Sequence, residues 1–517
     1  MTTTLLSQNN TLHTVLDGGQ RMMVMLAIIT LPIRHLPVSL PLVGGDFMRL
    51  FIYAGLLLGL IDHYLFPRKY TTIEKQGLLF LAAVLFWGMI CTVIGIMEYP
   101  YFSQIDLLQM DKFKNVYDTL LARTNTVSEL AAMKVWLFIK AIRGSVFEIV
   151  NTYLMSLWVY SLYHDKSKAL LKDFSIAVAF LVFIMSVYSV IEVGYLTGNV
   201  ACKNLLVKIN PMYMKIASDH GWWPPLLWKG QLRSLYLEPS FLGLTAAFLL
   251  PVLCSRIFKN LNFINLVLLN ALILMIFLTK ARTATLLLIG ELGLFGLFLL
   301  LSSKESIIFK GCVIFLSTVL MFGASLSILS RYTSGNQGTQ LEDIGVTEYV
   351  EENVISITGN KRSNSARFGN MHATLVTGLR HPLFGVGRGM QHMYIRDNLT
   401  EAERNVGEIR LWITKMEEKG PFKSGLPILN EFTGQIAQTG VVGLALFLLP
   451  IFYILKNFSK KKQFFADWNV ISCFVAYIGV VVAMLPNAVT IPYFLMTGAM
   501  LVLLHDDKNE RTGMENE

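Results

Sequence analysis

The stretch LVLLNALILMIFLTKARTATLLLIGELGLFGLFLLL, residues 266–301, decides the fold. Two long apolar runs flank a short polar break at residues 279–283. A helix that crosses a bilayer needs ~20 largely apolar residues, because its backbone N–H and C=O groups find no other partners in hydrocarbon. Each run is long enough for one crossing. We therefore predict two membrane helices, at 261–279 and 283–302, with the break between them at one membrane face.

Apolar runs of this kind recur along the whole chain. Of its 517 residues, 54% are hydrophobic and 15% are charged, with a mean hydropathy of +0.52, which exceeds what a soluble core of this size requires. We predict an all-α polytopic membrane protein with about twelve transmembrane helices. The further spans are expected at 22–41, 47–66, 77–97, 144–163, 175–196, 238–255, 311–330, 434–455, 470–485 and 489–504.

Basic residues in alternate connections predict the orientation of these spans. Pairs such as Arg68 with Lys69 and Lys166 with Lys168 fall in every second loop, and the positive-inside rule assigns those loops and both termini to the cytoplasm. The formal charge of +9 is therefore interpreted as a topology signal, and no nucleic-acid partner is expected. The polar N-terminus has no cleavable signal, so the first apolar run is expected to remain as an anchor.

The same topology divides the chain into three parts. We predict transmembrane helices 1–9 in residues 1–330, a large extracytoplasmic loop at 331–433, and helices 10–12 with a cytoplasmic tail in 434–517. Smaller outer segments are expected at 98–143 and 198–237. The large loop mixes basic and acidic residues in near balance, which favours a folded, partly helical cap. Tryptophans in the second segment are expected to anchor it at the headgroup boundary, namely Trp222, Trp223 and Trp228.

Several basic residues lie at predicted outer helix ends, where topology does not explain them. They are Lys140, Arg143, Arg233, Arg282 and Arg367. Any one of them is accounted for by a side chain that snorkels to headgroups. Together they predict a clamp for a multiply charged anion, because the guanidinium fork matches phosphate oxygens, and a lipid-linked diphosphate is the obvious candidate. Glu238 is expected to pair with one of these arginines or, less favoured, to accept a hydroxyl proton.

Four stretches together resemble the bacterial O-antigen polymerase and O-antigen ligase superfamily, with the polymerase branch closer. They are RSLYLEPSFLG (233–243), LTKARTATLLLIG (278–290), SARFGNMHATLVTGLRHPLFGVGRGM (365–390) and NEFTGQIAQTGVVGLALF (430–447). Arg282 and Gly293, like Arg367 and Gly378, are separated by ten residues, a spacing associated with the polymerases. Each motif is weak alone, but their order and common predicted side strengthen the combination.

This resemblance implies a glycosyltransferase on the outer face of a bacterial cytoplasmic (inner) membrane. The enzyme would move a growing O-antigen, lipopolysaccharide or capsule-type glycan from undecaprenyl diphosphate to a lipid-linked repeat unit. Undecaprenyl-diphosphate-linked oligosaccharides and membrane lipid are the implied partners, with a chain-length regulator as a further expectation. No cofactor is expected and metal independence is implied, since the sequence shows neither convincing metal-ligand spacing nor a nucleotide phosphate loop.

The resemblance also implies roles for individual residues. Arg282 and Arg233 are assigned to the diphosphate, Arg367 to the diphosphate or glycan, and Glu238 or His381 to the acceptor proton. Further substrate-binding candidates are Lys140, Arg143, Lys280, Arg380, Arg388 and Asn430. The glycines Gly385, Gly387 and Gly389 are expected to allow a sharp turn with positive φ.

Two other functions stay open. A ligase would move finished glycan to another carrier, but ligases usually carry a histidine just before the asparagine of the helix that re-enters the membrane, and Leu429 precedes Asn430 here. A transporter or flippase would form no glycosidic bond. The chain shows no internal repeat, and its polar mass lies in one late loop, which disfavours the common transporter architectures.

Overall fold

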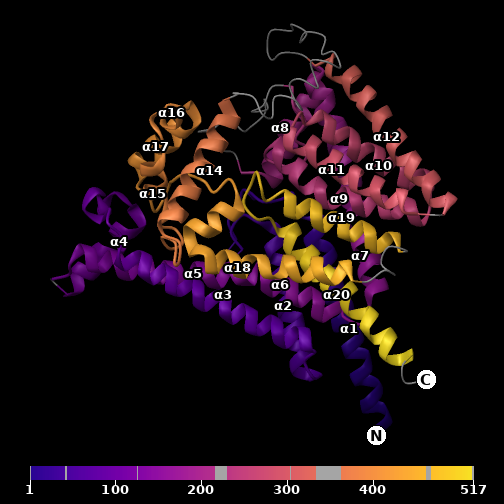
Figure 1. Ribbon diagram of the computed structural model, residues 1–517, viewed down its shortest axis with the longest axis horizontal. Coiled ribbons are helices and arrows are strands. Elements are labelled where there is room, and N and C mark those ends of the chain that lie inside the picture. Colours follow the sequence, from indigo (N-terminus) through magenta and orange to yellow (C-terminus); the bar gives the residue numbers. More distant parts are fainter. Residues whose placement is uncertain are drawn as a thin grey trace.

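A computed structural model describes residues 2–40, 43–124, 126–215, 230–302, 304–332, 362–460 and 467–514, and every regular element in these ranges is a helix (Figure 1). Seven described helices are long and apolar enough to cross a membrane: α2 (Phe47–Leu65), α3 (Thr72–Met97), α7 (Ser167–Leu196), α9 (Pro239–Lys259), α11 (Arg282–Leu300), α12 (Glu305–Leu329) and α18 (Glu431–Ser459). The shorter apolar helices are α10 (Phe263–Leu278), α19 (Trp468–Val482) and the first part of α20 (Ile491–Met514). The predicted all-α polytopic membrane fold is confirmed.

Most predicted spans coincide with one helix each, and the first and fourth need correction. The span predicted at 22–41 is wrong in its second half, because α1 (Thr2–Ile29) stops before Pro32 and Pro37. The chain then folds back on itself, with the Leu36 N–H donating to the Gly45 carbonyl at 2.9 Å. The span predicted at 144–163 is instead two helices, α5 (Glu129–Val150) and α6 (Tyr153–Tyr163).

The break between α5 and α6 has a local cause. The Asn151 side-chain amide donates to the Phe147 carbonyl at 2.6 Å and to the Tyr53 hydroxyl at 2.9 Å. A side chain that binds its own backbone in this way competes with continuation of the helix. Because α5 starts at Glu129, Lys140 and Arg143 lie within a helix rather than before one, which corrects their predicted position at a helix end.

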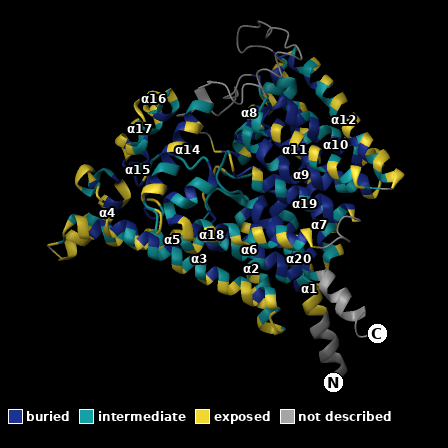
Figure 2. Ribbon diagram, viewed as in Figure 1, coloured by how far each residue is buried: buried dark blue, intermediate teal, exposed yellow. Residues whose placement is uncertain are grey.

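Helix α9 forms the centre of the bundle. It packs against α7, α10, α11 and α19, and Figure 2 shows this region as mostly buried. Small residues permit the close approach, since a Cβ added at Gly243 would lie only 2.4 Å from the Cβ of Ala284 on α11. Membrane helices associate through such small-residue contacts because lipid supplies no hydrophobic driving force between them. The position of α11, and so of Arg282, is therefore fixed by tight backbone packing.

A helical cap covers one end of this bundle (Figure 1). It contains η1 (Phe102–Gln104), η2 (Leu107–Gln109), α4 (Asp111–Thr124), α14 (Arg362–Arg380), α15 (Gln391–Asn398), α16 (Glu401–Arg404) and α17 (Gly407–Lys419). Its separate apolar core joins residues from two of the three predicted outer segments, 98–143 and 331–433, among them Tyr99, Phe113, Met133, Ile395 and Leu426. The predicted helical character of the large loop is thus confirmed for its described part. Residues 333–361 and the predicted boundary tryptophans lie outside the described residues, and α8 (Val200–Tyr213) packs beside α7.

A glycine-rich loop connects the cap to a kink in α18. Gly440 has φ +69° and ψ −170°, a conformation essentially restricted to glycine, and the kink interrupts the helical hydrogen bonds around it. The loop supplies the missing partners: the N–H groups of Val386 and Gly387 donate to the carbonyls of Ala437 and Gln438 at 2.8 and 3.1 Å. The prediction of positive φ at the three loop glycines is confirmed, with values of +63° at Gly385, +85° at Gly387 and +80° at Gly389.

Candidate functional site

The largest cavity near the predicted arginines is a groove of about 720 Å³, here called the arginine groove. Helices α11, α14 and α19 and the segments around residues 429–430 and 485–486 form it. Its wall on α11 repeats at helical spacing, with Arg282, Leu286, Gly290 and Leu294 on one face. That face is about 18 Å long from Arg282 to Leu294 at the rise of an α-helix. The interior is mostly apolar, with the buried carboxylate of Glu291 as a polar exception in its lining. A charged mouth and a mostly apolar interior of this length suit an amphipathic ligand.

Arg282 lies at the mouth of the arginine groove because of the turn that precedes it. The chain leaves α10 at Thr279, and Lys280 adopts φ +49°, which reverses direction so that Arg282 becomes the first residue of α11. Its Nη1 donates to the Asn364 side-chain oxygen on α14 at 2.8 Å. This hydrogen bond to a neutral amide orients the guanidinium at the groove mouth, where its N–H donors suit an anion.

Arg367 stands at the same mouth, on the cap helix α14. Its Nη1 donates to the Pro486 carbonyl at 2.7 Å, in the connection between α19 and α20. Arg367 is exposed, whereas Arg282 is half-buried. The structure therefore brings together two arginines that the sequence predicted from separate motifs, and each begins one of the two arginine-glycine spacings.

Asn430 also lines the arginine groove. Its side-chain oxygen accepts from the Thr433 N–H at 2.9 Å, which caps α18, and its amide donates to the Leu485 carbonyl at 2.8 Å. These bonds satisfy the asparagine internally and fix the start of α18 against the α19–α20 connection. Of the residues predicted to bind substrate, Asn430 thus joins the groove chiefly as a structural element of its wall.

Arg233 is not part of the arginine groove. Its side chain is 5% exposed and its Nε lies 3.7 Å from a Glu192 carboxylate oxygen on α7. The same carboxylate accepts from the Arg233 and Ser234 backbone N–H groups at 3.2 and 2.7 Å, and Nη1 of Arg233 donates to the Tyr236 carbonyl at 3.3 Å. The guanidinium is buried beside an opposite charge and away from the groove, so the geometry gives the predicted diphosphate role of Arg233 no support.

The two residues predicted for the acceptor proton lie apart from the lining of the arginine groove. Glu238 precedes α9 and accepts from the Ser240 hydroxyl at 3.3 Å. Burial raises the pKa of its carboxyl, while that hydrogen bond and the charge of Arg367 lower it. The pairing of Glu238 with one of the arginines stays a prediction. His381 packs edge-on against the Tyr394 ring, with centroids 5.2 Å apart, and burial lowers its pKa.

The remaining predicted basic residues have local partners. Lys140 donates to the Phe422 carbonyl at 2.8 Å, which joins α5 to the cap, and Arg143 lies over the Phe147 ring at 5.6 Å. Arg380 donates to the Asn398 side chain at 2.5 Å. Lys280 stands beside Arg282 in the turn before α11. None of these four side chains is among the described residues that line the arginine groove.

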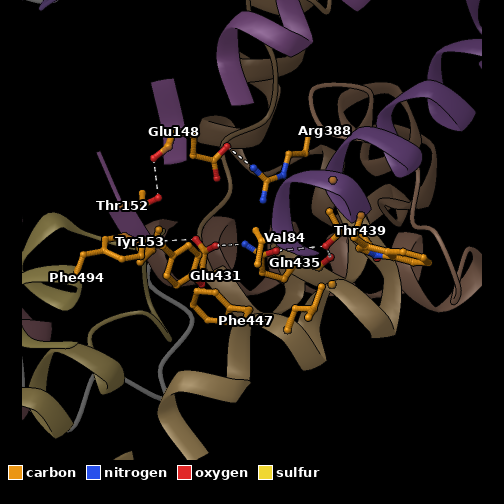
Figure 3. A pocket seen from close by; sticks show the side chains of 15 residues that line it. Val84, Glu148, Thr152, Tyr153, Arg388, Glu431, Gln435, Thr439, Phe447 and Phe494 are labelled. Carbon is orange, nitrogen blue, oxygen red and sulfur yellow. Dashed lines mark hydrogen bonds and ion pairs between the residues drawn. The ribbon is translucent and has the colours of Figure 1, made fainter. Parts of the chain in front are cut away.

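Arg388 contributes to a second, smaller cavity, here called the polar cavity (Figure 3). About 30 Å³ of space lies between α3, α5, the start of α6 and α18. Its polar lining comprises Glu148, Thr152, Tyr153, Arg388, Glu431, Gln435 and Thr439. Arg388 forms an ion pair with Glu148, and the buried Glu431 lies beside this pair.

Sequence reasoning missed Glu148, Glu431 and Asn364 as site residues. Glu148 and Glu431 sit at the ends of apolar runs, and carboxylates so near hydrocarbon are a signal that could have been used, because they are costly unless they have a function or a partner. Asn364 carried no comparable signal. Within the described ranges, no group of three or more His, Cys, Asp or Glu side chains is arranged to hold a metal ion.

The fold and the two cavities define a multi-pass membrane protein with a charged groove mouth under a helical cap. Residues 267–448 match the family model described as O-Antigen ligase, a segment that includes α11, α14 and the kinked α18. This match confirms the predicted resemblance to the O-antigen polymerase and ligase superfamily over that segment, and it supports a membrane function in glycan processing. No curated protein and no solved structure matches the chain.

Proposed function

We propose that this protein is a polysaccharide polymerase that moves a growing glycan from undecaprenyl diphosphate to a lipid-linked repeat unit. The observation that carries the proposal is the convergence of Arg282 and Arg367 at the mouth of one apolar groove. A lipid diphosphate has the matching chemistry, since its anionic head requires cations and its tail requires an apolar channel.

The arginines would act on the leaving group. Breaking the bond between the anomeric carbon and the phosphate oxygen develops negative charge on the diphosphate. Donors already placed at that position stabilise the transition state more than the ground state. Nη1 of Arg282 donates to a neutral amide and Nη1 of Arg367 to a backbone carbonyl, and these two bonds orient the guanidinium groups at the groove mouth. The lipid donor itself supplies the energy, and this chain's residues need only bind, orient and stabilise.

The apolar wall would hold the first isoprene units of the carrier. Leu286 and Leu294 on α11 and Ile478 and Val482 on α19 line the groove below the arginines. Gly290 keeps the α11 wall flat, because a side chain at this position would narrow the channel. The groove therefore explains how one site can take both the charged head and the apolar start of the carrier.

One assay tests the proposal. Purified protein is incubated with undecaprenyl-diphosphate-linked repeat units, without nucleotide or added metal, and the glycans are separated on a gel. We expect a ladder of lengthened lipid-linked chains. Intact single repeats after incubation, with the protein folded and the substrate accessible, would overturn the polymerase assignment.

A ligase is the second candidate, because the matched family model is described as O-Antigen ligase. A ligase would transfer glycan to a different carrier rather than to another lipid-linked repeat. Leu429, which occupies the position of the usual ligase histidine, points an apolar side chain into the groove lining and offers no proton acceptor. Adding a lipid A-core acceptor to the same assay separates the two, since only a ligase would label it.

A further inference from the structure

We propose that the polar cavity receives the attacking hydroxyl of the acceptor glycan and that Glu431 takes its proton. This inference rests on the proposed polymerase function and adds to it a second site and a residue. The arginine groove accounts for the donor, but glycan transfer also requires a hydroxyl held where it can attack. The polar cavity supplies groups of the right kind, on the other side of a shared wall.

The two cavities lie back to back across the start of α18. Asn430 lines the arginine groove, and the next residue, Glu431, lines the polar cavity. The connection between α19 and α20 also contributes to both cavities, because Pro486 lines the arginine groove and Val489 lines the polar cavity. Both cavities therefore border the N-terminal end of α18. We place the transfer at this end of the helix, with the donor head at the groove mouth and the acceptor ring at the mouth of the polar cavity.

Glu431 is held in place and still has room for a proton. One of its carboxylate oxygens accepts from the Gln435 amide at 2.6 Å and the other from the Val489 N–H at 2.8 Å. A carboxylate offers about four lone-pair positions, so these two bonds leave further acceptor capacity. Gln435 is itself held through Thr439, whose hydroxyl donates to the Gln435 side-chain oxygen at 3.3 Å. The result is a carboxylate fixed in one orientation toward the cavity.

Arg388 supplies a donor that the protein does not use. Its terminal nitrogen pairs with Glu148, whereas its buried Nε has no hydrogen-bond partner among the described residues. A buried donor without a partner is unfavourable, and a bound oxygen would satisfy it. Figure 3 shows the Arg388 guanidinium between Glu148 and the carboxylate of Glu431.

The charges in the polar cavity favour a hydroxyl over a second diphosphate. Two carboxylates face one guanidinium, so the cavity carries no surplus positive charge for an anion. A sugar hydroxyl is both a donor and an acceptor, and it would donate to Glu431 while accepting from the Arg388 Nε. The space of about 30 Å³ holds one or two groups of the size of a water molecule but not a sugar ring. The ring would therefore rest at the cavity mouth with one hydroxyl inside.

The proposed step couples the loss of the acceptor proton to the departure of the diphosphate. The acceptor O–H bond breaks, its proton passes to the Glu431 carboxylate, and the oxygen forms a bond to the anomeric carbon of the donor. The bond between that carbon and the diphosphate oxygen breaks, and its electron pair stays on the diphosphate beside Arg282 and Arg367. Glu431 then returns the proton to water. In this scheme Glu238 replaces neither Glu431 nor the arginines.

The test compares Glu431→Gln with Arg388→Lys in the lipid-linked repeat assay. Glu431→Gln keeps the side-chain volume and removes the proton acceptor, so we expect chain extension to fall by about 100-fold or more. Binding of labelled undecaprenyl diphosphate to the purified variant should stay unchanged, because the arginine groove is intact. Arg388→Lys retains a cation for Glu148 and loses the Nε donor, so the KM for acceptor repeats should rise about tenfold with donor binding unaltered.

The controls separate this inference from the proposed function. Glu408→Gln, a substitution on α17 outside both cavities, should extend chains at the wild-type rate. A wild-type ladder together with unimpaired extension by Glu431→Gln would overturn the acceptor site alone. Loss of donor binding in Glu431→Gln, alongside lost extension, would show a structural role and would also overturn it. Absence of a ladder from the wild-type protein would instead refute the polymerase assignment.

Discussion

Nη1 of Arg282 and the side-chain oxygen of Asn364, 2.8 Å apart, join the first turn of α11 to the cap helix α14 across the mouth of the arginine groove. A membrane helix and a cap helix thus hold one cation between them through a neutral partner. The hydrogen bond orients the guanidinium, and a donor that is already oriented is what stabilises charge developing on a leaving group.

Replacing Arg282 by alanine should abolish chain extension without loss of the protein from the membrane. One missing transition-state donor costs ~3 kcal/mol, or roughly a hundred- to thousandfold in rate. Polymer ladders on a gel, measured beside membrane abundance of the variant, check this. Arg380→Ala is the matched control, because Arg380 contacts Asn398 in the cap rather than the groove. A normal ladder from Arg282→Ala would remove Arg282 from the active site.

Replacing Arg233 by alanine should instead destabilise the fold. The substitution leaves Glu192 buried without its cation, and removing one partner of a buried ion pair costs about 3–5 kcal/mol. Thermal unfolding of the detergent-solubilised variant measures this loss. The double variant Arg233→Met with Glu192→Gln should recover part of the stability. Equal stability of Arg233→Ala and wild type, with extension lost, would restore Arg233 to a catalytic role.

Apolar periodicity predicted the positions of most membrane helices, because lipid forces the backbone to satisfy itself within each span. It misplaced the helix ends near residues 30 and 151 for reasons that lie in single side chains. Pro32 stops α1, and the Asn151 amide binds the Phe147 carbonyl within its own chain segment. A proline is visible in the sequence. Whether an asparagine side chain hydrogen-bonds to solvent, to a neighbouring side chain or to its own backbone depends on the tertiary structure.

The sequence predicted the arginine pair of the site but could not separate Arg233 from it. Both Arg233 and Arg282 stand before a membrane helix, so their local patterns are alike. The difference lies in Glu192, a distant residue within the apolar run of α7, which reaches only Arg233 in the folded chain. For the same reason Glu431 escaped notice, because its importance comes from a cavity shared with α3 and α5.

Acidification should loosen the cap before the bundle. Nδ1 of His392 on α15 donates to the Leu426 carbonyl at 3.1 Å, and burial lowers the pKa of this histidine from 6.5 to about 4. A histidine whose folded pKa is depressed stabilises the fold above the unfolded pKa, and this contribution is lost as the pH falls toward the folded pKa. The contribution of His392 to the folding stability of the cap is therefore lost between pH 6.5 and pH 4, and it amounts to about 3 kcal/mol at most.

Hydrogen exchange of the α15 amides, followed between pH 7 and pH 4 with correction for the intrinsic rate, measures this loosening. The His392→Gln variant cannot gain the proton, so the exchange protection of its α15 amides should depend less on pH. This variant should also be less stable than the wild type at neutral pH. The α9 amides report on the bundle and should keep their protection throughout. If the α15 amides of the wild-type protein kept the same exchange protection from pH 7 to pH 4, protonation of His392 would not be what loosens the cap.

The kink at Gly440 should be indispensable for docking the cap on the bundle. Alanine at this position would be strained by about 1–3 kcal/mol from its backbone conformation alone. Its Cβ would also lie 2.0 Å from the Leu383 carbonyl oxygen, so the loop that carries Arg388 would have to move. We expect Gly440→Ala to lower thermal stability and to reduce chain extension, because the polar cavity loses its arginine while the arginine groove keeps both of its own. Gly323→Ala on α12 is the control, since nothing lies within 4 Å of the added Cβ and alanine favours a helix over glycine. Wild-type extension by Gly440→Ala would show that the loop docks without the kink.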